Sequence, residues 1–276
     1  MGSSRKVIVG ADDRGDPIGW APVTGAAAFF DVDNTMMRGA SLYWFARGLA
    51  ARDYFRPGDL ARFAWQQLRF RLLATEHAGD MSRARETALA FVAGWRVDEI
   101  ERLTWEIFDE LIEPRIWAGA RALAQQHLEY GQQVWLVSAA PVEIGRAIAA
   151  RLGLSGAIGT VAEVRDGAYT GRLVGDLMHG AAKAAAVRRL AEVEGLDLAR
   201  CTAYSDSSND IPMLSAVGQA VAVNPDAALL RVARERGWPV RDFRTGRRAV
   251  KIAVPSTVAA GALAGAGLAL RRHFAR

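Results

Sequence analysis

Two aspartates, one residue apart, end an apolar stretch near the start of the chain, in the sequence Asp31-Val32-Asp33-Asn34-Thr35. Side chains two positions apart point to the same side of a strand, so the two carboxylates would face each other. Burial of unpaired charge is strongly disfavoured. The pattern therefore indicates either a cation between the carboxylates or a turn that gives each acid a separate task. We expect both, with Asp31 as a nucleophile, Asp33 as an acid/base and a hard divalent metal ion beside them.

Apolar strand patterns alternate with helical patterns along most of the chain. One strand is expected before Asp31, and others at 133–137, 157–161, 161–164, 169–173, 202–204, 220–223 and near Val240. This alternation predicts an α/β fold with a doubly wound, Rossmann-like, mainly parallel sheet. In such sheets ligands bind beyond the carboxyl ends of the strands. Asp31, Ser138 and Asp206 each follow an apolar strand, so we expect all three at one edge.

The segment 41–113 carries helical periodicity and almost no strand character. We expect four helices there, with Asp59, Ser82 and Asp98 as N-caps of the later three and Pro114 after the last. The chain is then divided into a disordered leader at 1–24, a core domain at 25–40 and 114–243, an inserted helical domain at 41–113, and a C-terminal tail at 244–276.

The basic excess of the chain lies in its last part. The whole chain has a net charge of +5, whereas residues 231–276 carry +9, from eleven Lys and Arg and two acids. Within the tail, Ile252 to Leu270 are nineteen residues without a charge, close to the about 20 residues that span a bilayer. These features are compatible with a membrane span, with contact of 244–276 with an anionic membrane surface, or with a terminal helix docked on the core or a partner. Nucleic-acid binding is not expected, because no aromatic and basic face accompanies the charge.

The single cysteine, Cys201, excludes an intrachain disulfide and fits a reducing cytoplasm. It opens an apolar run, so we expect it to be a buried core residue. Residues 1–24 contain no apolar signal-peptide core. We therefore expect a cytoplasmic protein that is either free or held, peripherally or by an anchor, at the inner face of the membrane.

Four motifs follow one another in the order found in a known family. They are Asp31-Val32-Asp33-Asn34-Thr35, Ser138 after Val134–Val137, Lys183 at the start of a helix, and Ser205-Asp206-Ser207-Ser208-Asn209-Asp210. With these motifs, residues 26–242 resemble the haloacid dehalogenase (HAD) superfamily, in particular subfamily IB, the branch of phosphoserine phosphatase. Taken alone, each motif residue has an ordinary structural role: the aspartates are typical of helix caps, Ser138 of a turn and Lys183 of a solvated surface. Together and in order they favour the family.

The resemblance implies a phosphomonoester hydrolase. Asp31 would attack phosphorus and form an aspartyl-phosphate. Asp33 would protonate the departing alkoxide and then take a proton from the water that breaks the intermediate. Mg²⁺ would be held by the Asp31 carboxylate, the main-chain carbonyl of Asp33, and Asp206, because it prefers oxygen ligands.

The same resemblance implies roles for the other motif residues. Ser138 and Lys183 would bind the phosphoryl group. Asp210 would orient Lys183 or a metal-bound water from outside the metal's ligand set. Asn209 would touch the substrate or support the loop, and Thr35 would fix the loop after the first strand. The inserted helical domain resembles the family's cap, which closes over the site.

Ala40 stands where the resemblance places a glutamate that receives the amino group of phosphoserine. We therefore expect a small phosphate ester other than phosphoserine. Arg38, close by, would suit a second anionic or neutral polar group, or is simply an exposed residue. The basic and aromatic composition of the insertion leaves a lysophospholipid-type phosphate at the membrane as an alternative. A second alternative, a catalytically idle scaffold or membrane adaptor, is not favoured by the intact motifs.

Overall fold

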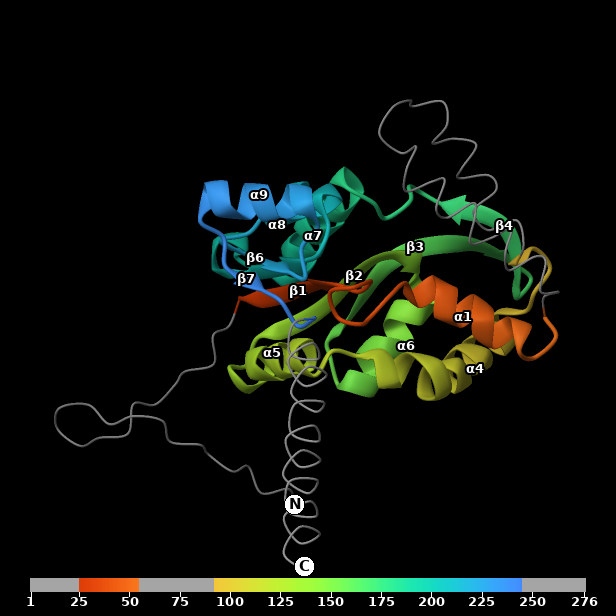
Figure 1. The fold of residues 1–276 in the computed structure, drawn as a ribbon. Helices are drawn as coiled ribbons and strands as arrows, with labels where there is room; N and C mark the ends of the chain where they lie inside the picture. The colour runs from red at the N-terminus through yellow and green to blue at the C-terminus, as the bar shows by residue number, and fades with distance from the viewer. Residues whose placement is uncertain (1–24, 55–91, 245–276) are drawn as a thin grey trace, which may run out of the picture.

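A computed structural model describes residues 25–54 and 92–244 of the chain (Figure 1). The predicted leader, the second and third helices of the insertion, and the uncharged run in the tail lie outside these residues. In the part of the chain that is described, no helix is both long and apolar enough to cross a bilayer.

A seven-stranded sheet forms the centre of the fold, in the order β4-β3-β2-β1-β5-β6-β7. The strands are β1 (Ala27–Asp31), β2 (Gln133–Pro141), β3 (Gly156–Arg165), β4 (Ala168–Val174), β5 (Thr202–Ser205), β6 (Gln219–Val223) and β7 (Val240–Arg241). β4 runs antiparallel to β3, and the other pairs are parallel. The predicted α/β fold with a mainly parallel sheet is confirmed.

Helices cover both faces of this sheet (Figure 1). They are α5 (Ala118–Glu129), α6 (Val142–Leu152), α7 (Ala181–Glu194), α8 (Ile211–Leu214) and α9 (Ala227–Arg236). Ala27 and Phe29 of β1 belong to the apolar cluster shared with α7, α8 and α9, whereas Ala28 and Phe30 belong to the cluster shared with α5 and α6. Because β1 is buried on both sides, its sequence before Asp31 is apolar at every position.

The described parts of the segment 41–113 pack against the core. They are α1 (Ser41–Ala50), α4 (Val97–Ile107), a π-helical turn at Phe108–Ile112 and a 3₁₀ turn at Glu113–Arg115. Phe45 of α1 and Ile107 of α4 lie in the same apolar cluster as Ile144 and Ile148 of α6. The first and last helices predicted in the insertion are thus observed, and the division of the chain into domains stays a prediction.

The predicted N-cap of α4 is wrong. The cap position is Arg96, and Asp98 lies inside the first turn, where it accepts a hydrogen bond from Arg96 Nε at 3.0 Å. An acid in the first turn is favourable through the helix dipole. The sequence pattern therefore located the start of the helix to within two residues but assigned Asp98 the wrong role.

β2 and β3 are longer than predicted. β2 continues from Val137 to Pro141 through a shift of register against β3. Thr160 of β3 holds this extension, because its Oγ1 donates to the carbonyl oxygen of Ala139 at 2.7 Å. Ser138 consequently lies in the irregular end of β2 and not in a loop beyond it.

Gly159 of β3 allows the close approach of the end of β2. A Cβ atom at this position would meet the Cα of Val142 at 2.7 Å and the carbonyl oxygen of Ala140 at 2.9 Å. We expect Gly159→Ala to displace this end of β2 and to lower the free energy of unfolding by about 1–3 kcal/mol, as overpacking does. Urea denaturation measures the loss.

Asp166→Asn in the turn between β3 and β4 is the control. Asp166 is exposed, and its φ of 50° is one that asparagine adopts. An unfolding midpoint of Gly159→Ala equal to that of wild type would contradict the close packing described.

Candidate active site

The carboxyl edge of the sheet gathers residues from all four motifs. β1 ends at Asp31, and the neighbouring β5 ends at Ser205, directly before Asp206. On the other side of β1, Val137 of β2 pairs with Asp31, so Ser138 lies one position beyond this pair. The parallel strands thus bring together side chains that are far apart in the sequence.

Lys183, in the first turn of α7, joins two aspartates. Its Nζ donates to Asp31 Oδ1 at 2.5 Å and to Asp210 Oδ2 at 2.8 Å. None of the three residues is more than 5% exposed. A buried ion pair is tolerated only when the charges are paired and hydrogen-bonded, and here two carboxylates share one ammonium.

Ser205 supports this contact, and its role was missed by the sequence analysis. Its Oγ donates to Asp210 Oδ2 at 2.7 Å and accepts the N–H of Ser207 at 3.2 Å. Asp210 therefore has two side-chain donors, Ser205 and Lys183, and makes no side-chain cap on α8. A polar residue at the end of a fully buried strand was the signal that could have identified Ser205.

The electrostatics of the site reflect an excess of carboxylates. Burial raises the pKa of Asp31 to about 8 against the lowering effect of Lys183, and the carboxylates of Asp210, Asp206 and Asp33 add to the rise. Burial disfavours the charged form of Lys183, but Asp31 and Asp210 outweigh it and raise the pKa of this ammonium above its usual range. One ammonium therefore does not neutralise the negative charge of the site, and a divalent cation would favour the ionised form of Asp31.

Asp33 is held by the first helix of the insertion. The main-chain N–H of Ser41, at the start of α1, donates to Asp33 Oδ1 at 2.8 Å. The chain between them turns at Asn34, which has a φ of 59° and whose Oδ1 accepts the N–H of Gly39 at 3.0 Å. A carboxylate at a helix N-terminus is stabilised by the unpaired N–H groups there. The predicted start of a helix soon after Asp33 was the available signal for Ser41.

The loop after β6 ties the other loops together. The Nδ2 of Asn224 donates to the carbonyl oxygen of Asn34 at 2.8 Å. The N–H of Asp226 donates to the carbonyl oxygen of Asp206 at 2.8 Å. The Oδ1 of Asp226 caps α9, because it accepts the N–H of Leu229 at 2.7 Å. These contacts with the loops after β1 and β5 were not predicted from the sequence.

The other predicted site residues have simpler surroundings. The Oγ of Ser138 accepts the N–H of Ala140 at 3.1 Å. Thr35 is fully buried, and its Oγ1 has no hydrogen-bond partner among the described residues. Asn209 is exposed, and its N–H donates to Ser207 Oγ at 3.3 Å.

The oxygen atoms of the site suit a hard divalent cation such as Mg²⁺. Within residues 25–54 and 92–244, no three acidic, histidine or cysteine side chains are grouped closely enough to form a complete ligand set. The set implied by the family resemblance needs only two carboxylates, Asp31 and Asp206, with the carbonyl of Asp33 and retained waters. The excess of carboxylates around Lys183 fits such an ion.

A cavity of about 530 Å³ lies beside Asp206. It is lined by Asn34, Arg38, Trp117, Asp206, Asn224, Asp226 and Arg244. Most of its lining comes from the loops that follow β1, β5 and β6, with Trp117 before α5 and Arg244 after β7, so it belongs to the same edge of the sheet as Asp31. The volume is within the range of about 300–1,000 Å³ that is usual for small-molecule sites.

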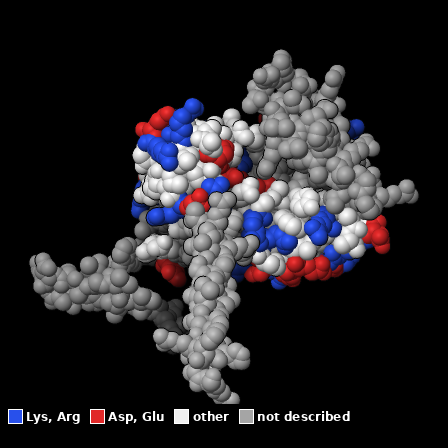
Figure 2. Space-filling view, in the orientation of Figure 1, with Lys and Arg blue, Asp and Glu red and all other residues white. Residues whose placement is uncertain are grey.

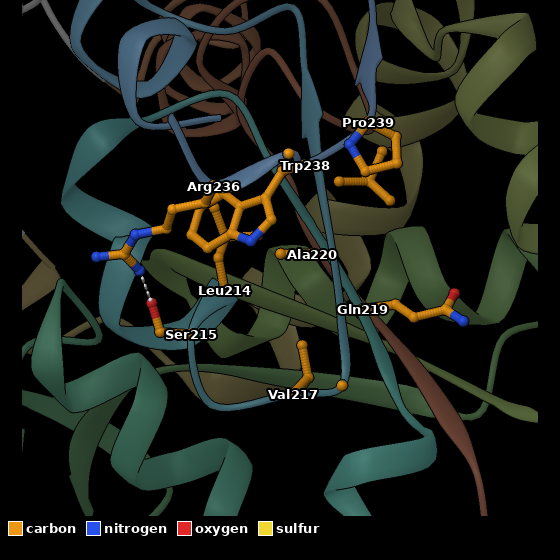
Figure 3. Close-up of a pocket in the computed structure, with 11 residues that line it drawn as sticks. Leu214, Ser215, Val217, Gln219, Ala220, Arg236, Trp238 and Pro239 are labelled. Atoms are coloured by element: carbon orange, nitrogen blue, oxygen red, sulfur yellow. Dashed lines mark hydrogen bonds between the residues drawn. The ribbon is translucent and has the colours of Figure 1, made fainter. Parts of the chain in front are cut away.

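A second cavity, of about 430 Å³, lies around the start of β6 (Figure 3). Trp238 and Arg236 border it, and Arg236 Nη1 donates to Ser215 Oγ at 2.8 Å. Because β6 begins there and runs parallel to β5 and β1, this cavity lies at the opposite end of the sheet. It contains none of the predicted site residues.

The family model of the haloacid dehalogenase-like hydrolases matches residues 28–215. This chain belongs to that family. Phosphoserine phosphatase SerB1 of Mycobacterium tuberculosis (strain ATCC 25618 / H37Rv) is 55% identical over 269 residues, which cover 97% of this chain and 86% of the relative. Histidinol-phosphatase of Neisseria meningitidis serogroup C (strain 8013) is 30% identical over 221 residues, 79% of this chain and 98% of that one.

A solved structure of a protein with unknown function from Bordetella pertussis Tohama I has the same fold as this HAD hydrolase. It superposes with a TM-score of 0.71 and 30% identity, over 80% of this chain and 100% of that chain. The predicted membership of the superfamily is confirmed.

The raised pKa of Asp31 predicts how stability depends on pH. Between the ordinary aspartate pKa near 4 and about 8, the folded chain holds a proton on Asp31 that the unfolded chain has lost. Stability therefore falls as the pH rises through this range. The test compares wild type with Asp31→Asn by urea denaturation in EDTA. The free energy of unfolding of wild type minus that of Asp31→Asn should decrease from pH 4 to pH 8.

Asp166→Asn is the control, because Asp166 is exposed in the turn between β3 and β4. The difference in the free energy of unfolding between Asp166→Asn and wild type should be the same at every pH. A constant difference between wild type and Asp31→Asn across the range would contradict the proposed protonation of Asp31.

Proposed function

We propose that this HAD hydrolase is a Mg²⁺-dependent phosphomonoesterase that acts through an aspartyl-phosphate on Asp31. The observation that carries the proposal is the buried contact of Lys183 with Asp31 and Asp210 at the carboxyl edge. The relatives named phosphoserine phosphatase and histidinol-phosphatase support it. The substrate in this proposal is a small phosphorylated molecule of the cytoplasm.

In the first half-reaction, a carboxylate oxygen of Asp31 bonds to phosphorus while the bond from phosphorus to the ester oxygen breaks. Lys183 favours the ionised form of Asp31 and offsets the charge on the phosphoryl oxygens. Ser138 donates its hydroxyl to one of these oxygens. Asp33, in its acid form, gives its proton to the departing alkoxide, which leaves as the alcohol.

In the second half-reaction, the Asp33 carboxylate takes a proton from water while the water oxygen bonds to phosphorus. The bond from phosphorus to Asp31 breaks, which releases inorganic phosphate and restores the Asp31 carboxylate. Asp210 orients Lys183 throughout, and the N–H of Ser41 orients Asp33. Mg²⁺, held by Asp31, the carbonyl of Asp33, and Asp206, would supply further positive charge beside the phosphoryl group.

The remaining parts of the chain have supporting roles in this proposal. Residues 25–40 and 114–243 form the catalytic core, and 41–113 form a cap over it. Thr35 fixes the loop after β1, and Asn209 supports the loop after β5 or meets the substrate. The alternative substrate, a lysophospholipid phosphate, was based on the composition of the insertion and on the tail, and most of these residues lie outside the described ones. The paired and buried Asp31, Lys183 and Asp210 speak against an idle scaffold.

Asp31→Asn should abolish hydrolysis of p-nitrophenyl phosphate, with a loss in kcat of about a thousandfold or more, because the amide cannot act as the nucleophile. EDTA should remove the activity of wild type, and Mg²⁺ should restore it. Asp166→Asn serves as the matched control and should keep wild-type kcat. Undiminished turnover by Asp31→Asn would refute the aspartyl-phosphate mechanism.

Ser41→Pro isolates the hydrogen bond that holds Asp33. Ser41 is the first residue of α1, a position that tolerates proline, so the change removes the N–H and keeps the helix. We expect kcat for an alkyl phosphate to fall by about tenfold or more, with a smaller loss for p-nitrophenyl phosphate, whose leaving group needs no proton. Steady-state kinetics on the two esters measures this difference.

Ser41→Ala is the matched control. It keeps the N–H and removes a buried hydroxyl that has no hydrogen-bond partner among the described residues, so it should resemble wild type. If Ser41→Pro lost the same factor on both esters, the N–H of Ser41 would not act through Asp33.

A further inference from the structure

Three arginines lie together beside the loop that follows β1. Arg38 belongs to this loop, Arg47 to α1, and Arg115 to the 3₁₀ turn at the end of the insertion. The Cζ atoms of Arg115 and Arg47 lie 3.4 Å and 5.5 Å from the centroid of the Trp44 ring. The N–H of Arg38 donates to the carbonyl oxygen of Arg115 at 2.8 Å. We name Arg38, Arg47 and Arg115 the arginine cluster.

The arginine cluster has no carboxylate partner in the described residues. Arg115 uses its Nη1 on the carbonyl oxygen of Leu111, and its pKa is lowered by burial and by the charges of Arg38 and Arg47. Nearby arginines do have acidic partners: they are Arg52 with Glu106 and Glu110, Arg96 with Asp98, Arg102 with Glu106, and Arg121 with Glu113. Like charges held together without a counter-charge favour the binding of an anion.

The face of the molecule around α1 shows the same imbalance. Figure 2 shows basic side chains gathered over the loop after β1 and over α1, with acidic side chains along the lower rim. Both Arg38 and Arg47 are exposed, so an anion from solution can reach them. Their charge is therefore available to a ligand in the described structure.

Arg38 connects the arginine cluster with the active site, because it also lines the cavity beside Asp206. The other arginine of this lining, Arg244, is neutralised by two hydrogen bonds to Asp242, at 3.0 Å and 2.9 Å. Trp117 also lines the cavity, and the Cζ of Arg38 lies 5.8 Å from the centroid of the Trp117 ring. The Nε1 of Trp117 is buried and has no hydrogen-bond partner among the described residues.

We propose that the arginine cluster binds a second anionic group, carried by the alcohol part of the substrate, while the first phosphate is at Asp31. This proposal rests on the phosphatase function proposed above and specifies its substrate class. Arg38 contacts the second group from the cavity, and Arg47 and Arg115 add the surrounding positive charge. Three guanidinium groups suit a phosphate better than a single carboxylate, because a phosphate monoester carries about −1.5 to −2 charge and three acceptor oxygens, whereas a carboxylate carries one charge and two oxygens.

Three esters with one glycerol skeleton test the proposal. Glycerol 3-phosphate has a neutral alcohol part, 3-phosphoglycerate adds a carboxylate, and glycerol 1,3-bisphosphate adds a phosphate. We expect kcat/KM of wild type to be at least about tenfold higher for the bisphosphate than for glycerol 3-phosphate, because each charge-assisted hydrogen bond contributes such a factor. The carboxylate ester should lie between them. A preference for the carboxylate alone would still support an anion site, with a carboxylate as its ligand.

Arg38→Gln should reduce the ratio between the bisphosphate and glycerol 3-phosphate by about tenfold. Arg102→Gln is the matched control, because Arg102 is an exposed arginine of α4 paired with Glu106. It should keep the wild-type ratio. Equal kcat/KM of wild type for the three esters, or an unchanged ratio in Arg38→Gln, would overturn the proposal.

A binding experiment separates this proposal from the phosphatase function. Asp31→Asn protein, with and without Arg38→Gln, is titrated with the same esters in a calorimeter. The bisphosphate should bind at least about tenfold more tightly than glycerol 3-phosphate, and Arg38→Gln should remove this difference. Failure of wild type to hydrolyse any ester, with the binding preference intact, would refute the phosphatase function and leave the anion site standing. Equal affinities would refute the anion site.

Discussion

The hydrogen bonds from Lys183 to Asp31 and Asp210 are the contacts on which the site depends. A carboxylate at the end of a strand that is buried on both faces loses its hydration, and its charged form is then unfavourable. Lys183 replaces part of this hydration with a fixed cation, and Asp210 keeps that cation in place with the help of Ser205. In the proposed mechanism, Asp31 would therefore need little reorganisation of its surroundings when it reacts.

The parallel sheet makes this arrangement possible by collecting short loops at one edge. The loops after β1, β5 and β6 are joined by main-chain and side-chain hydrogen bonds through Asn224 and Asp226. Each loop therefore restricts its neighbours. Ser138 is also held by a contact between segments. It lies in the irregular end of β2, which the hydrogen bond from Thr160 to Ala139 fixes in place.

Much of this edge could be predicted from the sequence, because strand ends and acidic motifs are local patterns. The placement of Asp31 and Asp206 at this edge was predicted in this way, as was the mainly parallel sheet, whereas Lys183 was singled out by the order of the family motifs. The roles of Ser205 and Ser41 were missed because they arise from hydrogen bonds to Asp210 and Asp33, and the local patterns at the two serines do not identify these partners. The role of Asp98 was misassigned for a similar reason, since the pairing with Arg96 competes with a capping geometry that looks equally favourable in the sequence.

The arginine cluster illustrates a further limit of sequence reasoning. Arg115 lies far from Arg38 and Arg47 in the sequence, and the described arginines between them include both paired and unpaired ones. Only the described contacts distinguish Arg52, which meets Glu110, from Arg47, which lies over Trp44. Charge composition therefore pointed to the insertion as a whole, and the structure identifies the particular residues.

The hydrogen bond from Ser41 to Asp33 joins the inserted segment to the core, and this has a consequence for protein engineering. The first residue of the inserted segment supplies a donor to a residue of the core, and α1 is packed tightly on α4, where Gly48 leaves room for Ile107. The described start of the inserted segment is therefore coupled to the core by this hydrogen bond. In a chimera that exchanges residues 41–113 for the insertion of a relative, Asp33 would keep this donor only if the new segment begins as a helix at the same position.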